Sequence, residues 1–334
     1  MSKIVRRILI AAFLLCFAGA VLIGIGTAAG GVKYFSERNQ SSQFRGTGKF
    51  YEAEENLASF KNIDIRLEAS DLCILPSKDG ACRLSYRIYG SKKENPLSFA
   101  VEGDTLTIKE DLSFEQGYVN IDLGDMISFI GKGRDFPDEN PKEGIYLYLP
   151  TDYKAATVNM DSKSGDVRMK GLTADKLSLK LAYGDLVLDH VTSGRTEAAV
   201  SNGDIKAENS SLQQMSVKDS YGDVKTEDCT LSDFSAKLSN GDLKLANTTL
   251  SGANVLDLSY GDVILTGLSP DPSTISWKLK VNYGDLKLPE SLLNAPGTDT
   301  HYKNDDLSEF SLQQKEAAAV SISIDSKNGD ITVK

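Results

Sequence analysis

The sequence predicts an all-β protein: a single-stranded parallel β-helix, or β-solenoid, with about 19–20 residues per coil, preceded by one N-terminal transmembrane helix. Two observations support the solenoid. A Gly-Asp-apolar tripeptide recurs at intervals of 19, 19, 19, 19, 20, 23 and 45 residues between positions 165 and 329, and a period near 20 fits stacked coils. Short alternations of apolar and polar residues, typical of strands, fill these intervals. A third observation, one long uncharged segment near the N-terminus, predicts the helix.

The uncharged segment covers residues 8–31, which are 24 positions without a charged side chain. At 1.5 Å per residue this length crosses roughly 30 Å of hydrocarbon. Lys3, Arg6 and Arg7 precede it, so the positive-inside rule makes residues 1–7 a cytoplasmic tail and places the C-terminal part outside the cell membrane. Cleavage as a signal peptide after Ala29 is the alternative, but an apolar segment longer than about 7 to 15 residues favours a retained single-pass anchor.

The remaining chain divides by composition. Residues 32–56 are polar and contain Ser and Gly, which predicts a linker. Residues 57–334 are the predicted extracytoplasmic β-solenoid, with irregular coils over 57–156, regular Gly-Asp repeats over 157–289, an insertion over 290–319 and a final coil over 320–334. A further insertion, 122–144, carries the apolar patch Met126–Ile130. We expect it to fold against the body as a loop, with membrane or partner contact as the alternative.

The residues at one position of successive coils form what we call a column. The column after the Asp is always aliphatic, and strand alternation points it into the core, where it stacks on itself. The glycine column is explained by a turn that needs positive φ or close backbone approach. The predicted structural repeat turns are Gly165 and Asp166, Gly184 and Asp185, Gly203 and Asp204, Gly222 and Asp223, Gly241 and Asp242, Gly261 and Asp262, Gly284 and Asp285, and Gly329 and Asp330.

The column before the glycine holds mostly Tyr and Asn. We expect both to be structural: Asn tolerates the left-handed region and pairs along a stacked column, while Tyr stacks on a neighbour two coils away or covers the corner. A platform for sugars is the alternative interpretation of the tyrosines. The column is Ser164, Tyr183, Asn202, Tyr221, Asn240, Tyr260, Tyr283 and Asn328.

The aspartates would stand about 4.8 Å apart in adjacent coils, where two charges in water repel by roughly 1 kcal/mol. We expect each carboxylate to cap the backbone N–H groups of its own turn and to be balanced by the column of Lys206, Lys225 and Lys244. A calcium-stabilised adhesin is the alternative, although the repeat lacks the calcium-binding nonapeptide. The sequence therefore predicts structural aspartates and no metal ligands.

Catalytic chemistry finds little support in this sequence. The two histidines, His190 and His301, lie in unrelated contexts, neither in a zinc-ligand spacing nor beside a serine nucleophile motif. Catalysis needs a unique constellation, and the aligned side chains here recur in every coil. We predict no enzyme, no catalytic residues and no cofactor. A carbohydrate-active enzyme on a β-helix is the alternative, because acidic pairs could serve a glycosidase or lyase.

The net charge of -10 disfavours a nucleic acid partner, which requires a basic face. Cys73 and Cys82 bracket eight residues on the predicted outer side of the membrane, where a disulfide could persist. Spacing alone leaves that bond open. Cys229 falls in an apolar column and is predicted to be a core residue.

The repeat signatures SKSGDVRM, LAYGDLVL, VSNGDIKA, DSYGDVKT, LSNGDLKL and LSYGDVIL follow an IYLYLP strand and an N-terminal membrane segment. In this order they resemble the bacterial LiaG-like putative adhesin family, membrane-anchored β-solenoid domains of unknown function, over roughly residues 60–334. The resemblance implies a non-enzymatic scaffold or recognition module at the cell envelope, acting in adhesion or envelope-stress signalling. It carries no catalytic residues. We expect an envelope protein or polysaccharide as partner, although no sequence feature names it.

Overall fold

The computed structural model describes residues 49–90, 94–112, 143–304, 306–314 and 318–334. The predicted transmembrane segment 8–31 and most of the insertion 122–144 lie outside these residues. Within the described part, no helix is long and apolar enough to cross a membrane. Residues Phe50–Lys334 form one compact unit, and the account below concerns that unit.

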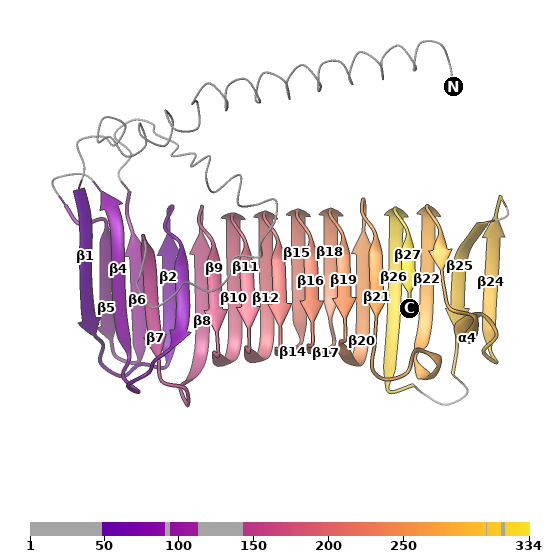
Figure 1. Ribbon diagram of the computed structural model, residues 1–334, viewed down its shortest axis with the longest axis horizontal. Coiled ribbons are helices and arrows are strands. Elements are labelled where there is room, and N and C mark those ends of the chain that lie inside the picture. The colour runs from indigo at the N-terminus through magenta and orange to yellow at the C-terminus, as the bar shows by residue number, and fades with distance from the viewer. Residues whose placement is uncertain (1–48, 91–93, 113–142, 305, 315–317) are drawn as a thin grey trace, which may run out of the picture. The chain divides into compact units, whose positions relative to one another are not determined.

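The unit is all-β and consists of two facing sheets whose strands follow one another as successive coils (Figure 1). In the regular region each coil contributes a long strand to one sheet and a strand of four residues to the other. The long strands are β8 (Lys154–Ser162), β10 (Thr173–Tyr183), β12 (Thr192–Asn202), the pairs β14 (Ser211–Gln213) with β15 (Met215–Tyr221) and β17 (Thr230–Ser232) with β18 (Ser235–Asn240), and β20 (Thr249–Leu258). The short strands are β9 (Val167–Lys170), β11 (Leu186–Asp189), β13 (Ile205–Glu208), β16 (Val224–Glu227), β19 (Leu243–Ala246) and β21 (Val263–Thr266).

The register of the strands confirms the 19-residue coil. Strands β10 and β12 run parallel with Leu177 opposite Thr196, and β11 and β13 run parallel with Leu186 opposite Ile205. Because the register equals the sequence repeat, equivalent residues stack directly upon one another. The aliphatic column after the aspartates is at most 8 % exposed throughout, so it forms the core as predicted. Its members are Val167, Leu186, Ile205, Val224, Leu243, Val263, Leu286 and Ile331.

Glycine is required at the turn because consecutive coils touch there through their backbones. A Cβ on Gly241 would lie 1.8 Å from the carbonyl oxygen of Gly222, and Gly241 has φ +142°. The same contact recurs between Gly203 and the oxygen of Gly184, at 2.1 Å. Close backbone approach, one of the two predicted reasons for the glycine, is therefore present together with positive φ.

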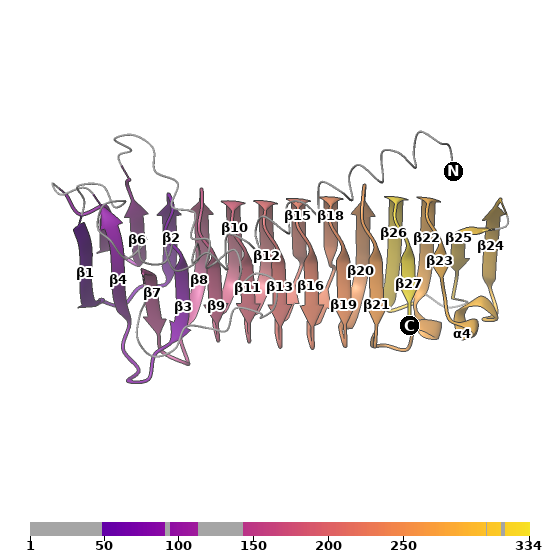
Figure 2. The ribbon, with the colours of Figure 1, turned by 45° about the horizontal axis from the view of Figure 1, so that its top comes forward.

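The coils do not stack in simple chain order at the C-terminal end. Strands β26 (Val320–Asn328) and β27 (Ile331–Val333) insert between the coil of β20 and β21 and the coil of β22 (Ser276–Tyr283) and β23 (Leu286–Lys287), as Figure 2 shows. Residues 320–334, the final coil in the sequence, are therefore not the last coil of the stack. The segment between β23 and β26 explains the difference, since it is long enough to bring the chain back.

The segment predicted as an insertion, 290–319, has its own structure where it is described. It contains the short helix α4 (Glu290–Leu293) and an antiparallel hairpin of β24 (Thr298–Lys303) and β25 (Asp306–Leu312). Strand β25 pairs antiparallel with β22. The hairpin therefore covers the edge that β22 would otherwise leave open, whereas β23 is the last strand of the other sheet.

The N-terminal end is also out of chain order. It contains β1 (Lys49–Asn56), β2 (Asn62–Leu67), β3 (Leu72–Pro76), β4 (Arg83–Gly90), β5 (Leu97–Glu102), β6 (Thr105–Glu110) and β7 (Gly144–Leu149). Strand β7 lies between β3 and β4, parallel to the first and antiparallel to the second. Residues 49–56, which we had assigned to the linker, form the edge strand β1. Cross-strand contacts with β4 hold it, among them Arg87 over the Phe50 ring at 4.6 Å from the centroid.

This order separates the two cysteines proposed for a disulfide. Cys73 lies opposite Tyr146 on one side of β7, while Arg83, the residue after Cys82, lies opposite Tyr148 on its other side. Two strand spacings, about 9.6 Å, exceed the Cα separation that a disulfide spans. Cys73 and Cys82 are free thiols in the structure. Cys229 is buried in the core as predicted.

Replacing Gly241 by Ala tests the backbone contact at the turn. We expect a loss of about 3 kcal/mol or more in unfolding free energy, because the new methyl group would overlap the Gly222 carbonyl and positive φ is strained for alanine. Gly80→Ala is the matched control, since Gly80 also has positive φ but a Cβ there meets nothing within 4 Å. Equal melting temperatures of the two variants would contradict the contact.

Candidate functional site

The Gly-Asp turns lie along one edge of the solenoid, where they join each long strand to a short one. Backbone bonds continue across this edge: Gly184 N donates to Asn202 O (2.9 Å), Gly203 N to Tyr221 O (3.0 Å) and Gly241 N to Tyr260 O (2.9 Å). The edge is therefore a continuous surface with one turn per coil.

The aspartates of this edge form a chain of hydrogen bonds from coil to coil. Oδ1 of Asp185 accepts the backbone N–H of Asp204 (2.9 Å), and Oδ1 of Asp204 accepts that of Asp223 (2.8 Å). The same bond, at 2.8–3.0 Å, joins all the repeat aspartates in spatial order, namely Asp166, Asp185, Asp204, Asp223, Asp242, Asp262, Asp330 and Asp285. We had expected each carboxylate to cap its own turn. The structure corrects this, because each carboxylate caps the turn of the next coil.

The N-terminal start of this chain involves two residues that the repeat pattern does not reveal. Asp71 accepts the backbone N–H of Asp166 at 2.8 Å, although Ser70 stands where the later turns have glycine. Glu110, which is buried, receives the backbone N–H groups of Glu68, Ala69 and Ser70 at 2.8–3.1 Å and so fixes this first turn. An aspartate followed by an aliphatic residue, Asp71-Leu72, was the only sequence signal.

The second carboxylate oxygen is balanced by a cation two residues later. Asp223 pairs with Lys225 and Asp242 with Lys244, both at 3.0 Å, while Lys206 pairs with Glu208 at 2.7 Å. The predicted balancing role is thus present at Lys225 and Lys244 but not at Lys206. Burial alone would raise the pKa of Asp223, yet the Asp242 N–H and Lys225 outweigh it and lower that pKa. At Asp223 and Asp242 a lysine of the strand that follows therefore compensates the carboxylate charge locally.

The Tyr and Asn residues of this edge differ in their role. Asn202 donates from Nδ2 to the carbonyl of Ala182 (3.3 Å), Asn240 to that of Ser220 (3.2 Å) and Asn328 to that of Ser259 (3.2 Å). These bonds tie each coil to the backbone of its neighbour, and none of the three asparagines has the left-handed backbone that the sequence analysis associates with Asn. The tyrosines are exposed instead: Tyr183 by 61 %, Tyr221 by 62 %, Tyr260 by 59 % and Tyr283 by 72 %. Our expectation that they stack on one another is wrong, because two coils span about 9.6 Å and ring contacts need centroids within about 7 Å.

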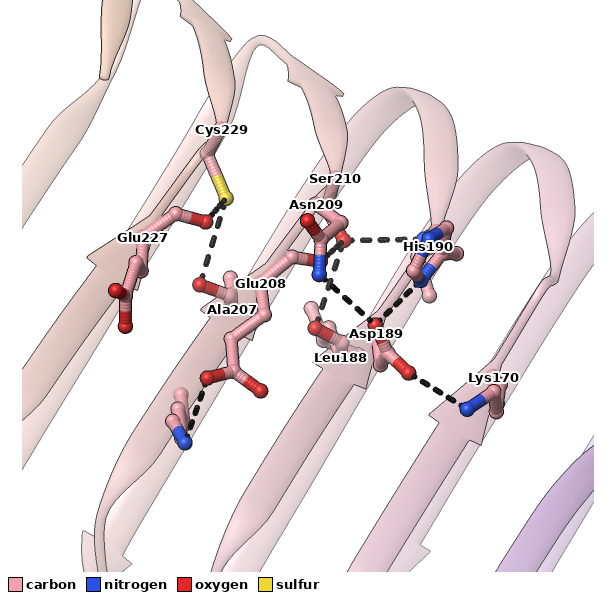
Figure 3. Close-up of polar contacts among 12 residues, drawn as sticks. Lys170, Leu188, Asp189, His190, Ala207, Glu208, Asn209, Ser210, Glu227 and Cys229 are labelled. Atoms are coloured by element: carbon pink, nitrogen blue, oxygen red, sulfur yellow. Dashed lines mark hydrogen bonds and ion pairs between the residues drawn. The ribbon is translucent and has the colours of Figure 1, made fainter. Parts of the chain in front are cut away.

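The opposite edge holds a polar cluster around Asp189, which Figure 3 shows in detail. The buried carboxylate of Asp189 lies 2.5 Å from His190 Nδ1 and 3.1 Å from Lys170 Nζ, and it accepts a bond from Asn209 Nδ2 at 3.4 Å. Burial opposes its ionisation, but these three partners outweigh burial and lower the pKa of Asp189. His190 and Asn209 occupy the same position of this turn in successive coils, and both have a left-handed backbone, with φ of 54° and 49°.

This cluster does not form a hydrolytic triad. The hydroxyl of the nearby Ser210 is buried, accepts the N–H of Val191 at 3.0 Å and donates to the carbonyl of Glu208 at 2.7 Å. A nucleophile needs a base within hydrogen-bond reach, and the His190 ring faces Asp189 instead. His301 lies on β24, in the C-terminal hairpin. Across the residues that the structure describes, no group of three His, Cys, Asp or Glu side chains could hold a metal ion.

One acidic residue faces the core. Asp219 of β15 is 3 % exposed and lies between Val200 and Leu238 of the flanking strands. Neither of its carboxylate oxygens has a hydrogen-bond partner in the described part of the chain. Burial outweighs the nearby backbone N–H groups of Tyr221 and Ser220 and, with a smaller contribution from the Asp204 and Asp223 charges, raises the pKa of Asp219 to about 7. This burial could not be predicted from the sequence, because the Asp-Ser-Tyr context of Asp219 resembles a surface turn.

Comparison with known proteins identifies one family. The family model described as Toastrack DUF4097 matches residues 60–334. No curated protein sequence matches the chain.

Three solved structures show low similarity to this chain. A putative cell adhesion protein from Clostridium sporogenes shares 12 % identity, with a TM-score of 0.26, over 86 % of this chain and 99 % of its own. A putative adhesin from Bacteroides fragilis shares 11 % identity, with a TM-score of 0.27, over 86 % and 97 %. A putative lipid binding protein from Parabacteroides distasonis shares 18 % identity, with a TM-score of 0.29, over 67 % and 96 %.

Asp223→Asn tests whether the aspartate column is structural or binds calcium. We expect a cost below about 1 kcal/mol, because asparagine keeps an acceptor for the Asp242 N–H while the lost ion pair with Lys225 is half exposed. Asp223→Ala is the control and should cost more, since it leaves that N–H without its acceptor. A large calcium-dependent rise in the melting temperature of the wild type, reversed by chelator and reduced by Asp223→Asn, would contradict the structural role.

Asp219 should make the protein less stable as pH rises. The unfolded chain ionises this group above its ordinary pKa of 3.8, while the folded protein keeps it protonated until about pH 7. The contribution of Asp219 to the free energy of unfolding is therefore fully present below pH 3.8, and it is lost as pH rises towards 7. Asp219→Leu should remove this dependence and stabilise the protein at pH 7 by about 3 kcal/mol.

Chemical unfolding at several pH values measures this effect. Asp219→Asn is the matched control, because it also removes the titration but keeps a buried polar group without a partner. We expect it to flatten the pH dependence without the full gain in stability. If Asp219→Leu left the pH profile unchanged, the burial of a protonated carboxyl would be refuted.

Proposed function

The chain belongs to the Toastrack DUF4097 family, and on that premise we propose that it is a non-enzymatic recognition or scaffold module at the bacterial cell envelope. In this proposal residues 8–31 anchor it in the cell membrane and the solenoid lies outside. Its partner is an envelope protein or polysaccharide.

The observation that carries the proposal is that the same side chains recur, coil after coil, along the Gly-Asp edge. Along it, the aspartates bond to the next coil and the asparagines bond to the previous one, so both are occupied in holding the coils together. What remains directed to solvent is the same side chain, tyrosine, at regular intervals. Such a surface suits a partner that is itself extended or repetitive, whereas catalysis needs one distinct arrangement of groups.

The finer assignment, to LiaG-like proteins acting in adhesion or envelope-stress signalling, is supported by the order of features in the chain. An uncharged segment preceded by three cations comes first, and the IYLYLP strand and the Gly-Asp coils follow. The excess of acid in the chain argues against a polyanionic partner, because two negative surfaces repel.

Protease treatment of intact cells tests the placement of the module. We expect added protease to cut between Lys33 and Lys49, in the predicted linker, and to release the Phe50–Lys334 unit, whose packed strands resist cleavage. Immunoblotting against the C-terminal region follows the fragment. A cytoplasmic protein of the same cells serves as the control and should stay intact.

One result of this experiment would contradict the proposal. Protection of the chain in intact cells, with the same cleavage after lysis, would place the solenoid inside the cell and overturn the proposal.

A further inference from the structure

Four exposed tyrosines, Tyr183, Tyr221, Tyr260 and Tyr283, form what we call the tyrosine ladder. In spatial order they alternate with asparagine without a break, as Tyr183, Asn202, Tyr221, Asn240, Tyr260, Asn328 and Tyr283. The last three positions alternate only because β26 inserts between β20 and β22. In chain order Tyr260 would be followed directly by Tyr283. The inserted coil thus keeps the spacing of the ladder at two coils up to its end.

The ladder is open to solvent along its length. Each ring is 59–72 % exposed, and among the described residues its one ring contact is Lys303, whose Nζ lies 5.7 Å from the centroid of Tyr283. Burying a tyrosine ring removes a large apolar area from water, and its hydroxyl can still bond at the rim. A row of such rings left exposed is typical of a binding surface.

The spacing of the ladder indicates the kind of ligand. Two coils correspond to about 9.6 Å, which is about the length of one disaccharide in an extended β-1,4-linked glycan. Successive sugars in such a chain turn over by about half a rotation, so every second ring presents the same face. A straight row of aromatic rings, one for each second coil, can therefore stack against equivalent faces of successive disaccharides.

The surroundings of the rings fit a neutral glycan. Asn202 and Asn240 lie in register between consecutive rings, so uncharged polar residues separate the rings along the ladder. The lysines beside the ladder are already paired with Asp223 and Asp242, and the chain carries an excess of acid, which disfavours an anionic polymer. The row of rings lies on the open surface, so a long glycan can lie along it without having to enter a closed channel by one end.

We propose that the tyrosine ladder binds one extended strand of a neutral β-1,4-linked polysaccharide, with one tyrosine per disaccharide. This inference rests on the proposed recognition function and names the ligand class of that surface. Each additional disaccharide reaches another ring, so affinity should increase with the length of the glycan.

Calorimetric titration of the full chain with β-1,4-linked N-acetylglucosamine oligomers tests the proposal. We expect binding to strengthen from the disaccharide to the hexasaccharide, which spans three rings, and to be absent with maltohexaose, whose α-linkages curve the chain. Tyr221→Ser should weaken hexasaccharide binding by about tenfold or more, equivalent to about 1.4 kcal/mol. The double variant Tyr221→Ser/Tyr260→Ser should abolish it, and the hexasaccharide should be recovered uncleaved.

Val255→Ala is the matched control. Val255 lies on β20, as a 51 % exposed apolar residue five positions before Tyr260, but off the ladder. It should bind as the wild type does. Melting temperatures of all variants should equal that of the wild type, because the replaced side chains are exposed.

Three outcomes would overturn the inference: no hexasaccharide binding, equal binding of maltohexaose, or binding unaffected by the double variant. A change in oligomeric state of the tyrosine variants in place of lost glycan binding would assign the ladder to contacts between copies of the chain. None of these results affects the placement found with protease on intact cells, so failure of this inference and failure of the proposed function are distinguishable.

Discussion

The approach of one glycine carbonyl to the next glycine α-carbon is the constraint on which the rest of the solenoid depends. It sets the coils so close at the Gly-Asp edge that a Cβ would lie about 2 Å from the neighbouring carbonyl oxygen, for example between Gly261 and Gly241. At that separation the backbone N–H of each aspartate faces the aspartate side chain of the preceding coil. The hydrogen-bonded chain of carboxylates is therefore a consequence of the glycines.

This arrangement also explains how a row of like charges is tolerated. Each aspartate donates its own N–H to the coil before it and accepts an N–H from the coil after it, as Asp223 does between Asp204 and Asp242. Hydrogen bonds to charged groups contribute about 1.5–3 kcal/mol each, which exceeds the repulsion of neighbouring carboxylates in water. The lysines that follow the aspartates add to a balance that the backbone already provides.

The sequence predicted the parts of the fold that are periodic. Because the strand register equals the sequence repeat, the coil length, the aliphatic column and the glycine turn can all be predicted from the repeat. Val224, for example, is buried as its place in the aliphatic column predicts. The parts it did not predict depend on contacts between distant segments. Asp71 joins the aspartate chain across 95 residues of sequence, and Glu110 reaches back to residues 68–70. The exposure of the tyrosines was missed because aromatic residues of one column were expected to stack, although Tyr183, Tyr221 and Tyr260 stand two coils apart. For Tyr260 and Tyr283 the same spacing depends on the inserted coil, which the chain order does not reveal.

That inserted coil has a consequence for how the molecule is made. Strand β26 hydrogen-bonds β20 on one side and β22 on the other, and β27 does the same for β21 and β23. During synthesis the coil of β22 and β23 leaves the ribosome before the strands that join it to the rest of the stack. The middle of the solenoid can grow one coil at a time as the chain emerges, but its C-terminal end must wait for residues 320–334. A ribosome that stalls shortly before that point would release a stack with an uncovered parallel edge, a recognisable substrate for proteases and chaperones.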